Sequence, residues 1–163
     1  MRHTDNPLHI EHSRKLGENI RAARVRKDLP DGKIGQGLDP KSIKSIENAE
    51  RSPRLLTLVK ISGELAVELE SLFEGIGPEE DGLEPPEPAD GPLGPLERFG
   101  ANLKWARTQA GLTQEELALQ AGVDRAAIGE FERGSVNLEA LTLFKLAHAL
   151  KLPPRVLLRG VRK

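Results

Sequence analysis

The sequence predicts an all-α protein in which two related helical domains are joined by an acidic, proline-rich linker. Three observations lead to this fold class. Apolar residues recur at helical spacing, the segments on either side of the linker resemble each other, and no stretch has the alternating pattern of a strand. The expected division of the 163 residues is a first domain at 1–75, the linker at 76–95 and a second domain at 96–163.

The internal repeat appears as a nearly constant offset between the two ends of the chain. Residues 16–24 match 99–107 at an offset of 83, and beyond residue 37 the offset is 85, so that residues 56–61 match 141–146. Agreement over this much of the chain, after one two-residue gap, indicates a tandem repeat of one small domain.

The second copy predicts five helices, of which the first three have clear boundaries. The first helix is expected to end near Gly111, because glycine favours helix termination. Thr113 and Glu116, three residues apart, predict a capping box at the start of the second helix. Gly122 supplies the next turn, and Asp124 is placed to cap the third helix.

The last two helices of the second copy close the expected bundle. The fourth helix carries apolar residues from Leu138 to Leu150 and ends before Pro153, since proline cannot continue a helix. A final turn follows at residues 156–158. Five helices in roughly 65 residues make a domain near the lower size limit for independent folding.

The first copy has the same expected five-helix plan but departs from it at the second helix. Its residues 30–36 are two residues shorter than the corresponding part of the second copy and are rich in glycine. Each interior glycine costs a helix about 1 kcal/mol relative to alanine, so a full second helix is doubtful there.

The linker at residues 76–95 carries six acidic and no basic side chains, giving −6, whereas the first and second domains have net charges of +1 and +4. Its prolines lack amide donors, and an extended chain of this length spans up to about 60 Å. It is expected to be an interdomain tether. The alternative is a disordered spacer whose acidity only aids solubility.

Composition excludes several classes of protein. The absence of cysteine excludes disulfides, zinc knuckles, iron–sulfur clusters and thiol nucleophiles. No apolar run approaches the roughly 20 residues of a membrane helix, and the N-terminus has no secretory signal, so a cytoplasmic protein is expected. The histidines His3, His9 and His12 have no partner ligands, and no nucleophile has a base, so neither a metal nor a cofactor nor an enzymatic activity is expected.

The segment 112–134 resembles the helix-turn-helix of the phage repressor and Cro (XRE) family of DNA-binding domains. The resemblance rests on Leu-Thr-Gln at 112–114, Gly-Val at 122–123 and Ile-x-x-Phe-Glu-x-Gly at 128–134, and it extends over residues 96–160. It implies a five-helix bundle that binds double-stranded DNA, with the recognition helix at 125–133 in the major groove.

The resemblance also implies which side chains contact DNA in the second copy. Arg125, Ala126 and Glu130 would face base edges, and Arg125 could donate to both acceptors of a guanine. Gln114 would bind a phosphate through its amide and adjacent backbone N–H groups, and Arg133 a neighbouring phosphate. Glu130 could accept from a cytosine amine but otherwise repels the DNA backbone.

The first copy has lost part of this pattern. Asp31 stands where the second copy has Gln114, and its charge is wrong for a phosphate. Four basic residues on its third helix and the following loop could still bind phosphates, namely Lys41, Lys44, Arg51 and Arg54. This copy is either a weaker half that holds the DNA backbone or a domain converted to protein contacts.

Both copies keep an arginine in the first helix and a glutamate at the end of the third, as Arg24 with Glu47 and Arg107 with Glu132. Members of this family often pair these residues. The pair is expected to fix how the first helix sits against the recognition helix, so these residues are structural rather than DNA-binding.

The expected function is that of a sequence-specific regulator of transcription that binds double-stranded DNA. The resemblance implies pairs of recognition helices about 34 Å apart, supplied by a homodimer or by the two copies of one chain as an intrachain pseudo-dimer. The alternative is a protein-interaction module, antitoxin-like or an adaptor, that uses the helix-turn-helix scaffold without contacting bases.

Overall fold

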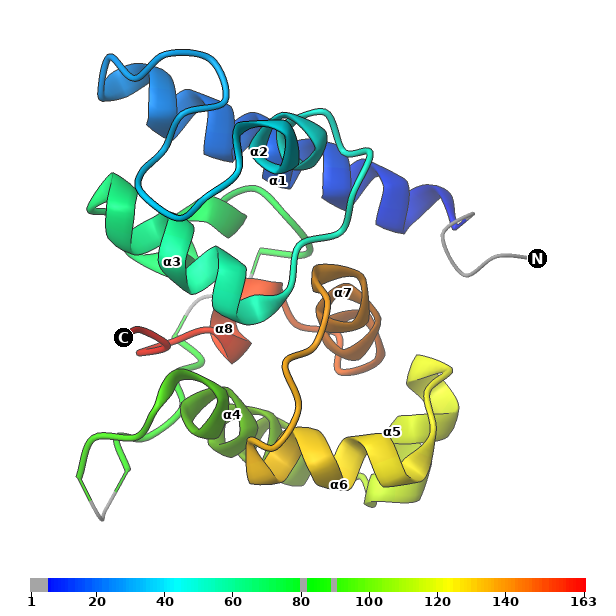
Figure 1. Cartoon of the computed structure of the whole chain (residues 1–163). Coiled ribbons are helices and arrows are strands. Elements are labelled where there is room, and N and C mark those ends of the chain that lie inside the picture. Colours follow the sequence, from blue (N-terminus) through cyan, green and yellow to red (C-terminus); the bar gives the residue numbers. More distant parts are fainter. Residues whose placement is uncertain (1–5, 80–81, 89–90) are drawn as a thin grey trace.

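The computed structural model describes residues 6–79, 82–88 and 91–163, and this part of the chain is all-α as predicted (Figure 1). It contains no β-strand, only an isolated bridge between Arg54 and Glu139. The helices, in order, are α1 (Pro7–Arg26), α2 (Pro40–Glu47), α3 (Leu55–Leu65), the 3₁₀ helix η2 (Leu69–Phe73), α4 (Pro95–Gln109), α5 (Gln114–Ala121), α6 (Arg125–Arg133), α7 (Ala140–Ala149) and α8 (Pro154–Leu157).

The C-terminal half, residues 91–163, has the five expected helices. The capping box at the start of α5 is present in full, because Thr113 Oγ1 accepts from the Glu116 amide and Glu116 accepts from the Thr113 amide. Gly122 and Gly134 end α5 and α6 in the left-handed conformation, which glycine adopts without strain. Asp124 occupies the N-cap position of α6 but makes no side-chain capping bond.

The N-terminal half, residues 6–79, differs from the expected five-helix plan, which is wrong for this half. Between α1 and α2 the described chain forms a loop instead of a second helix, so this half has three α-helices and η2. Gly32 and Gly37 have positive φ values of 73° and 78°, which interrupt a helix. Ile34 lies in this loop, and only 4% of it is exposed, so one apolar side chain of the loop fills the core.

The repeat extends to individual hydrogen bonds inside each half. Asn19 donates to the carbonyls of Leu72 and Glu74, and Asn102 donates to those of Leu157 and Arg159, each at 2.9 Å. These bonds attach the first helix of each half to the end of its last helix. The two halves therefore share a fold at the level of single contacts, apart from the missing helix.

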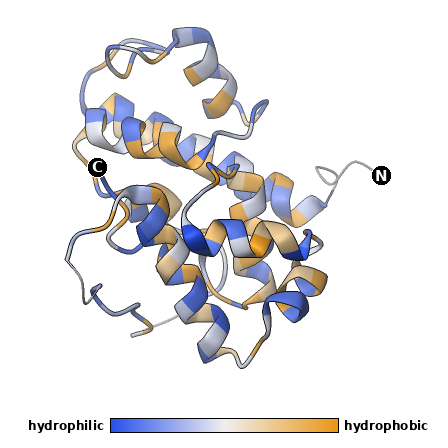
Figure 2. Ribbon diagram, turned by 60° about the horizontal axis from the view of Figure 1, so that its bottom comes forward, coloured by the Kyte–Doolittle hydropathy of each residue, from blue (hydrophilic) through white to orange (hydrophobic). Residues whose placement is uncertain are grey.

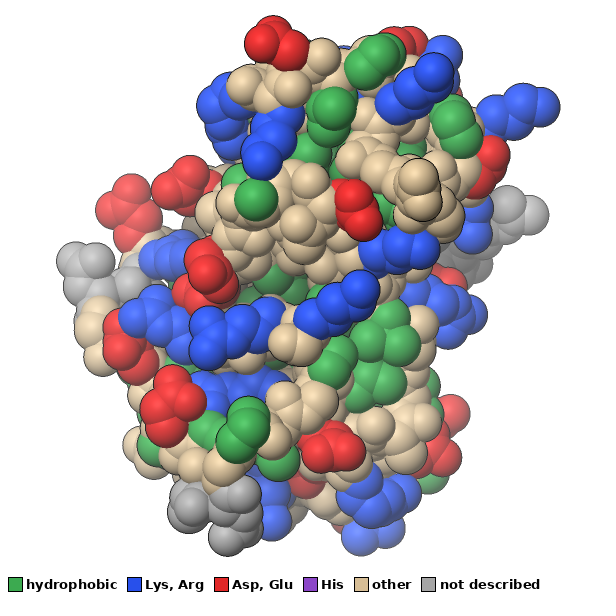
Figure 3. Space-filling view, turned by 60° about the vertical axis from the view of Figure 1, so that its left-hand side comes forward, with side chains coloured by type: hydrophobic (Ala, Val, Ile, Leu, Met, Phe, Trp, Pro, Cys, Tyr) green, Lys and Arg blue, Asp and Glu red, His purple; other side chains and the backbone are tan. Residues whose placement is uncertain are grey.

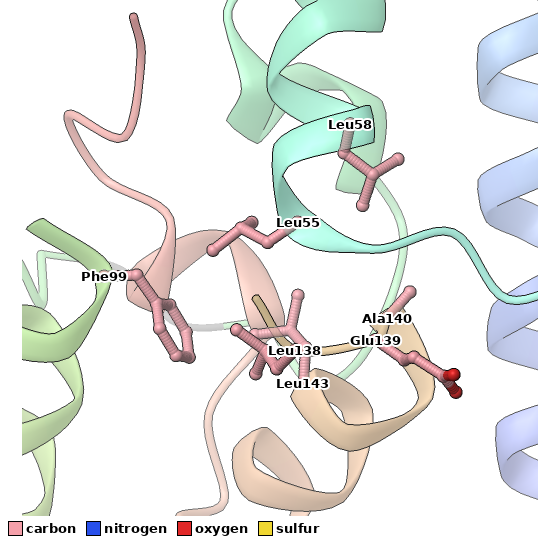
Figure 4. Close-up of a pocket in the computed structure, with 7 residues that line it drawn as sticks. All are labelled: Leu55, Leu58, Phe99, Leu138, Glu139, Ala140 and Leu143. Carbon is pink, nitrogen blue, oxygen red and sulfur yellow. The ribbon is translucent and has the colours of Figure 1, made fainter. Parts of the chain in front are cut away.

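The two halves pack against each other through α1 and α7, η2 and α8, and α3 and α4. Apolar parts of the helices turn inward and polar parts face outward (Figure 2). Leu55 and Leu58 from α3 meet Phe99 from α4 together with Leu138 and Leu143, in a space too small to hold a water molecule (Figure 4). The interface between the halves is thus part of one continuous hydrophobic core.

The described part of the linker lies on the protein surface rather than extending away from it. Glu84 forms an ion pair with Arg159, and Glu87 forms one with the buried Arg98 at 3.3 Å. Ile76, at the start of the linker, is buried. Acidic linker residues therefore bind basic residues of the C-terminal half, which differs from the expected extended tether.

Candidate nucleic-acid interface

The exposed face of α6 carries the side chains that the sequence assigned to DNA binding. Ile128 and Phe131 are buried against the rest of the C-terminal half, which fixes the rotation of the helix about its axis. Arg125, Ala126 and Glu130 lie on the opposite, exposed face. The structure therefore brings these three side chains together on one solvent-facing surface.

Arg133, at the C-terminal end of α6, is also exposed. Its guanidinium folds back over Gly129, where an added Cβ would lie 3.1 Å from Nη1. Because Gly129 has no side chain, the Arg133 guanidinium can lie close to the backbone of α6 at this position.

Gln114 is half-buried at the first position of α5, and its amide has a protein partner. Its Nε2 donates to Glu132 Oε2 at 2.7 Å. The same carboxylate accepts from Arg107 Nε, while Arg107 Nη1 donates to the Leu112 carbonyl at 2.8 Å. One carboxylate at the end of α6 thus fixes both the first helix and the start of α5.

The equivalent pair in the N-terminal half has the same geometry. Arg24 Nε donates to Glu47 Oε1 at 2.7 Å, and Nη1 donates to the Leu29 carbonyl at 2.9 Å. The hydrogen bond to Glu47 raises the pKa of Arg24 above its ordinary value. The structure therefore supports the expectation that both pairs are structural, because their charged groups are turned inward.

Glycines beneath these pairs allow the first helix to approach the end of the recognition helix. A Cβ on Gly17 would lie 2.4 Å from the Glu47 carbonyl oxygen, and one on Gly100 would lie 2.4 Å from that of Phe131. Contacts this short do not occur for real Cβ atoms, so both positions require glycine.

Three of the four basic residues assigned to the N-terminal half are bound to protein groups. Lys44 forms an ion pair with Asp31 at 3.0 Å, which lowers the pKa of the Asp31 carboxyl. Arg51 donates to Ser42 Oγ, and Arg54 donates to the Asn137 carbonyl at 2.9 Å.

The fourth, Lys41, is exposed on α2, and its charge helps to lower the pKa of the neighbouring Asp39 carboxyl, after the hydrogen bonds that Ser42 donates to it. Arg54 lies at the interface between the halves, 3.9 Å from Glu139. The sequence placed these four residues on the third helix of this half and the loop after it. In the structure Lys41 and Lys44 lie on α2, and Arg51 and Arg54 lie in the segment between α2 and α3, where Arg54 reaches the interface between the halves.

Sequence reasoning missed the polar residues that join the halves. The Leu55 amide donates to the Leu138 carbonyl, and the Ala140 amide donates to the Pro53 carbonyl, both at 2.8 Å. Flanking these bonds, the Leu56 amide donates to a side chain, Asn137 Oδ1, and the Leu141 amide donates to Ser52 Oγ, both at 3.0 Å.

These bonds are reciprocal under the offset of 85 residues found in the sequence. Residues 53 and 138 are equivalent, as are 55 and 140, so each half donates one of the two backbone bonds and accepts the other through equivalent residues. Reciprocal contacts of this kind are the property of a two-fold interface between identical subunits. The offset itself could have identified Ser52 and Asn137 as equivalent, but not that they face each other.

Three histidines lie at the interface between α1 and α7. The rings of His9 and His148 are 6.3 Å apart, and His12 contacts Phe144 edge-on at 5.3 Å between centroids. Burial lowers the pKa of both His9 and His12. His3, which the sequence grouped with them, lies outside the described residues.

Charged side chains on the surface are of both signs. One face of the molecule carries Lys and Arg side chains in a band, with Asp and Glu side chains beside it, so it is not uniformly basic (Figure 3). Among the described residues, no cluster of three or more His, Asp or Glu side chains could hold a metal ion. In that same part of the chain, no helix combines the length and apolar character needed to span a membrane.

Comparison with known proteins identifies the C-terminal half. Residues 103–157 match the family model described as helix-turn-helix. The chain is 39% identical over 51 residues to an uncharacterized HTH-type transcriptional regulator, y4dJ, of Sinorhizobium fredii. It is 36% identical over 62 residues to the SPbeta prophage-derived uncharacterized HTH-type transcriptional regulator YonR of Bacillus subtilis.

These matches cover limited parts of each sequence. They include 31% and 38% of this chain, and 66% and 57% of the two relatives, less than two thirds of either. Among solved structures, the restriction-modification controller protein C.AhdI of Aeromonas hydrophila is similar at 45% identity over 38% of this chain and 94% of that one, with a TM-score of 0.38. A hypothetical transcription factor, NHTF, of Neisseria is similar at 30% identity over 47% of this chain and 88% of that one, with a TM-score of 0.41.

Proposed function

Because residues 103–157 of this chain belong to the helix-turn-helix family of the phage repressor and Cro type, we propose that it is a transcriptional regulator that binds double-stranded DNA. It acts in the cytoplasm, and α6 enters the major groove. The chain is not an enzyme, since its relatives are named as transcriptional regulators, which is a non-enzymatic class.

The observation that carries the proposal is the free face of α6. Arg125, Ala126 and Glu130 are exposed, and α6 packs on α4 and α5 of its own half rather than on the N-terminal half. A recognition helix must present its outer face to the groove, so burial of this face between the halves would have excluded the function. Instead, the interface between the halves is built from other helices.

The four polar side chains of the C-terminal half have distinct roles in this proposal. Arg125, in the first turn of α6, donates to the two acceptors of a guanine, and Glu130, one turn further on, accepts from a cytosine amine. Arg133 binds a phosphate at the other end of the helix. Gln114 exchanges its bond to Glu132 for a phosphate oxygen, while its backbone N–H at the start of α5 points to the same phosphate.

In place of a homodimer, the N-terminal half acts as the second subunit. Its reciprocal bonds to the C-terminal half have the pattern of a two-fold dimer interface, which supports an intrachain pseudo-dimer. The exposed Lys41 is then available to bind a phosphate near the second recognition position. Lys44, Arg51 and Arg54 contribute positive charge only to the extent that DNA replaces their protein partners.

The test is DNA binding by full-length protein, measured by fluorescence anisotropy on duplexes enriched from a random library. Arg125→Ala should weaken specific binding about 5- to 150-fold, since a bidentate guanine contact is worth roughly 1–3 kcal/mol. Arg162→Ala is the matched control, because Arg162 is exposed beyond α8 and its loss changes net charge equally.

Two outcomes would contradict the proposal. Equal losses in the two variants would mean that only net charge matters, and the absence of any enriched duplex would mean that DNA is not the ligand. In either case, the scaffold would serve protein contacts instead.

A further inference from the structure

The two recognition positions of this chain are not equivalent, and this bears on the symmetry of its target. Resting on the proposed function, we propose that one chain, as a monomer, binds a non-palindromic DNA site. In that site α6 contacts the bases of one half-site, and α2 contacts chiefly the backbone of the other. Proteins that bind palindromes present two identical surfaces, and this chain has two different ones.

The difference is greatest at the positions that face the groove. Under the offset of 85 residues, Arg125 corresponds to Pro40 at the first position of α2. Proline has neither a side-chain donor nor an amide N–H, so α2 cannot donate to a guanine from this position. The exchange of Arg125 for Pro40 therefore removes the strongest hydrogen-bond donor from the base-facing positions of α2.

The neighbouring positions differ in the same direction. Ala126 corresponds to the exposed Lys41, and Glu130 corresponds to Ser45. A lysine is a point charge that suits a phosphate, and α2 thereby gains a basic group and loses an acidic one. The substitutions favour the DNA backbone over base edges on this side.

The missing helix removes a second set of contacts. In the C-terminal half, α5 begins at Gln114. The N-terminal half has a loop in place of this helix, with Asp31 at the position equivalent to Gln114. Asp31 is bound to Lys44 at 3.0 Å, so this carboxylate neutralises one of the cations of α2. The N-terminal half therefore binds its half-site more weakly and with fewer defined contacts.

The interface between the halves explains why a second chain is not required. Its reciprocal backbone bonds are made within one chain. Its apolar core is also buried within that chain and contains Leu55, Leu58, Leu138 and Leu143 (Figure 4). A second copy could use this surface only by displacing the first half of its own chain. The surface that would pair two chains is thus already occupied.

The dimensions also fit a single chain on one site. The helices α2 and α6 lie on opposite sides of the interface (Figure 1), and each ends six or seven residues before the Arg54–Glu139 bridge. Each connection is therefore at most about 25 Å long. Two such connections from one central point can accommodate recognition helices about 34 Å apart, one turn of the DNA.

The experiment is enrichment of duplexes from a random library with the full-length chain, followed by sedimentation of the complex to count chains per duplex. We expect an enriched site without two-fold symmetry that binds one chain. Arg125→Ala should relax base preference in one half-site only. Lys41→Ala should weaken binding to all sequences alike and reduce the salt slope by about 1, as expected for one phosphate contact.

The outcomes separate this inference from the proposed function. Palindromic sites bound by two chains would overturn the inference while supporting DNA binding. Base preference in both half-sites relaxed by Arg125→Ala would do the same, because it would require two copies of α6. If no sequence is enriched at all, the proposed function fails, and the inference fails with it.

Discussion

The carboxylate of Glu132 joins the stability of the C-terminal half to its candidate DNA-binding surface, so its removal tests both. In the structure it accepts from Arg107 and from Gln114, and its side chain is only 5% exposed, compared with 14% for that of Arg107. Glu132→Leu leaves the arginine with a single carbonyl partner, Leu112. Removing one partner of a buried pair costs roughly 3–5 kcal/mol, a large part of the 5–15 kcal/mol that stabilises a typical domain.

The interaction free energy of Arg107 and Glu132 is measured by a double-mutant cycle with urea unfolding. We expect Glu132→Leu to lower the free energy of unfolding by about 3 kcal/mol or more, and Arg107→Leu/Glu132→Leu to recover most of that loss, since replacing both charges leaves no unpaired ion. The Arg24→Leu/Glu47→Leu cycle is the matched comparison, because the side chain of Glu47 is only 1% exposed. If the double variant loses the sum of the losses in Glu132→Leu and Arg107→Leu, the two charges do not couple and the pair does not stabilise this half.

The same variant has a defined effect on DNA binding. Glu132→Leu frees the Gln114 amide without removing any side chain assigned to DNA, so binding should persist, with an affinity changed only through the position of α5 and α6. Far-ultraviolet circular dichroism should show retained helicity. Complete loss of helicity would contradict this prediction, whereas loss of DNA binding with helicity retained would contradict the purely structural role of the pair.

Three further predictions concern stability. Gly100→Ala should lower the free energy of unfolding by about 2 kcal/mol or more, because its Cβ would lie 2.4 Å from the Phe131 carbonyl oxygen. Gly63→Ala is the control: a Cβ there would have nothing within 4 Å, so the substitution should stabilise α3 by up to about 1 kcal/mol. Similar effects of the two substitutions on urea unfolding would contradict the close approach at Gly100. Burial lowers the pKa of His9 and His12 in the folded state, where His148, Lys145 and Glu11 are the neighbouring charged groups. The unfolded chain therefore takes up protons at a higher pH than the folded chain, and the melting temperature should fall as pH drops below about 6.5. The fall should be smaller in His9→Asn/His12→Asn. A melting temperature that falls equally in both proteins would assign the pH dependence to other groups. Asn137→Ala should cost roughly 1 kcal/mol by removing the acceptor for the Leu56 amide, and no measurable change would mean that this bond does not stabilise the interface between the halves.

Local signals predicted most of the C-terminal half. The capping box at Thr113 and Glu116, the turn at Gly122 and the prolines after α7 each act through neighbouring residues, and helices begin or end at these positions in the structure. The Arg107–Glu132 pair was also predictable, because the resemblance and the repeat both pointed to it.

The rest depended on contacts between segments far apart in the sequence. The glycine content made the second helix of the N-terminal half doubtful. No local pattern predicted that Ile34 fills the core in place of that helix, because its burial depends on packing against distant residues. Lys44, Arg51 and Arg54 look like phosphate ligands in sequence, yet each has a protein partner in the structure. The acidic residues of the linker showed its negative net charge in the sequence, but the sequence did not predict that they form ion pairs with Arg98 and Arg159.

The most direct test of the central claim is methylation protection of guanine N7 in an enriched duplex, comparing the native chain with Arg125→Ala. We expect the native chain to protect a guanine in one half-site. The variant, at concentrations that saturate the duplex, should lose that protection while neighbouring positions stay protected. An unchanged pattern in the variant would mean that the exposed face of α6 does not contact bases.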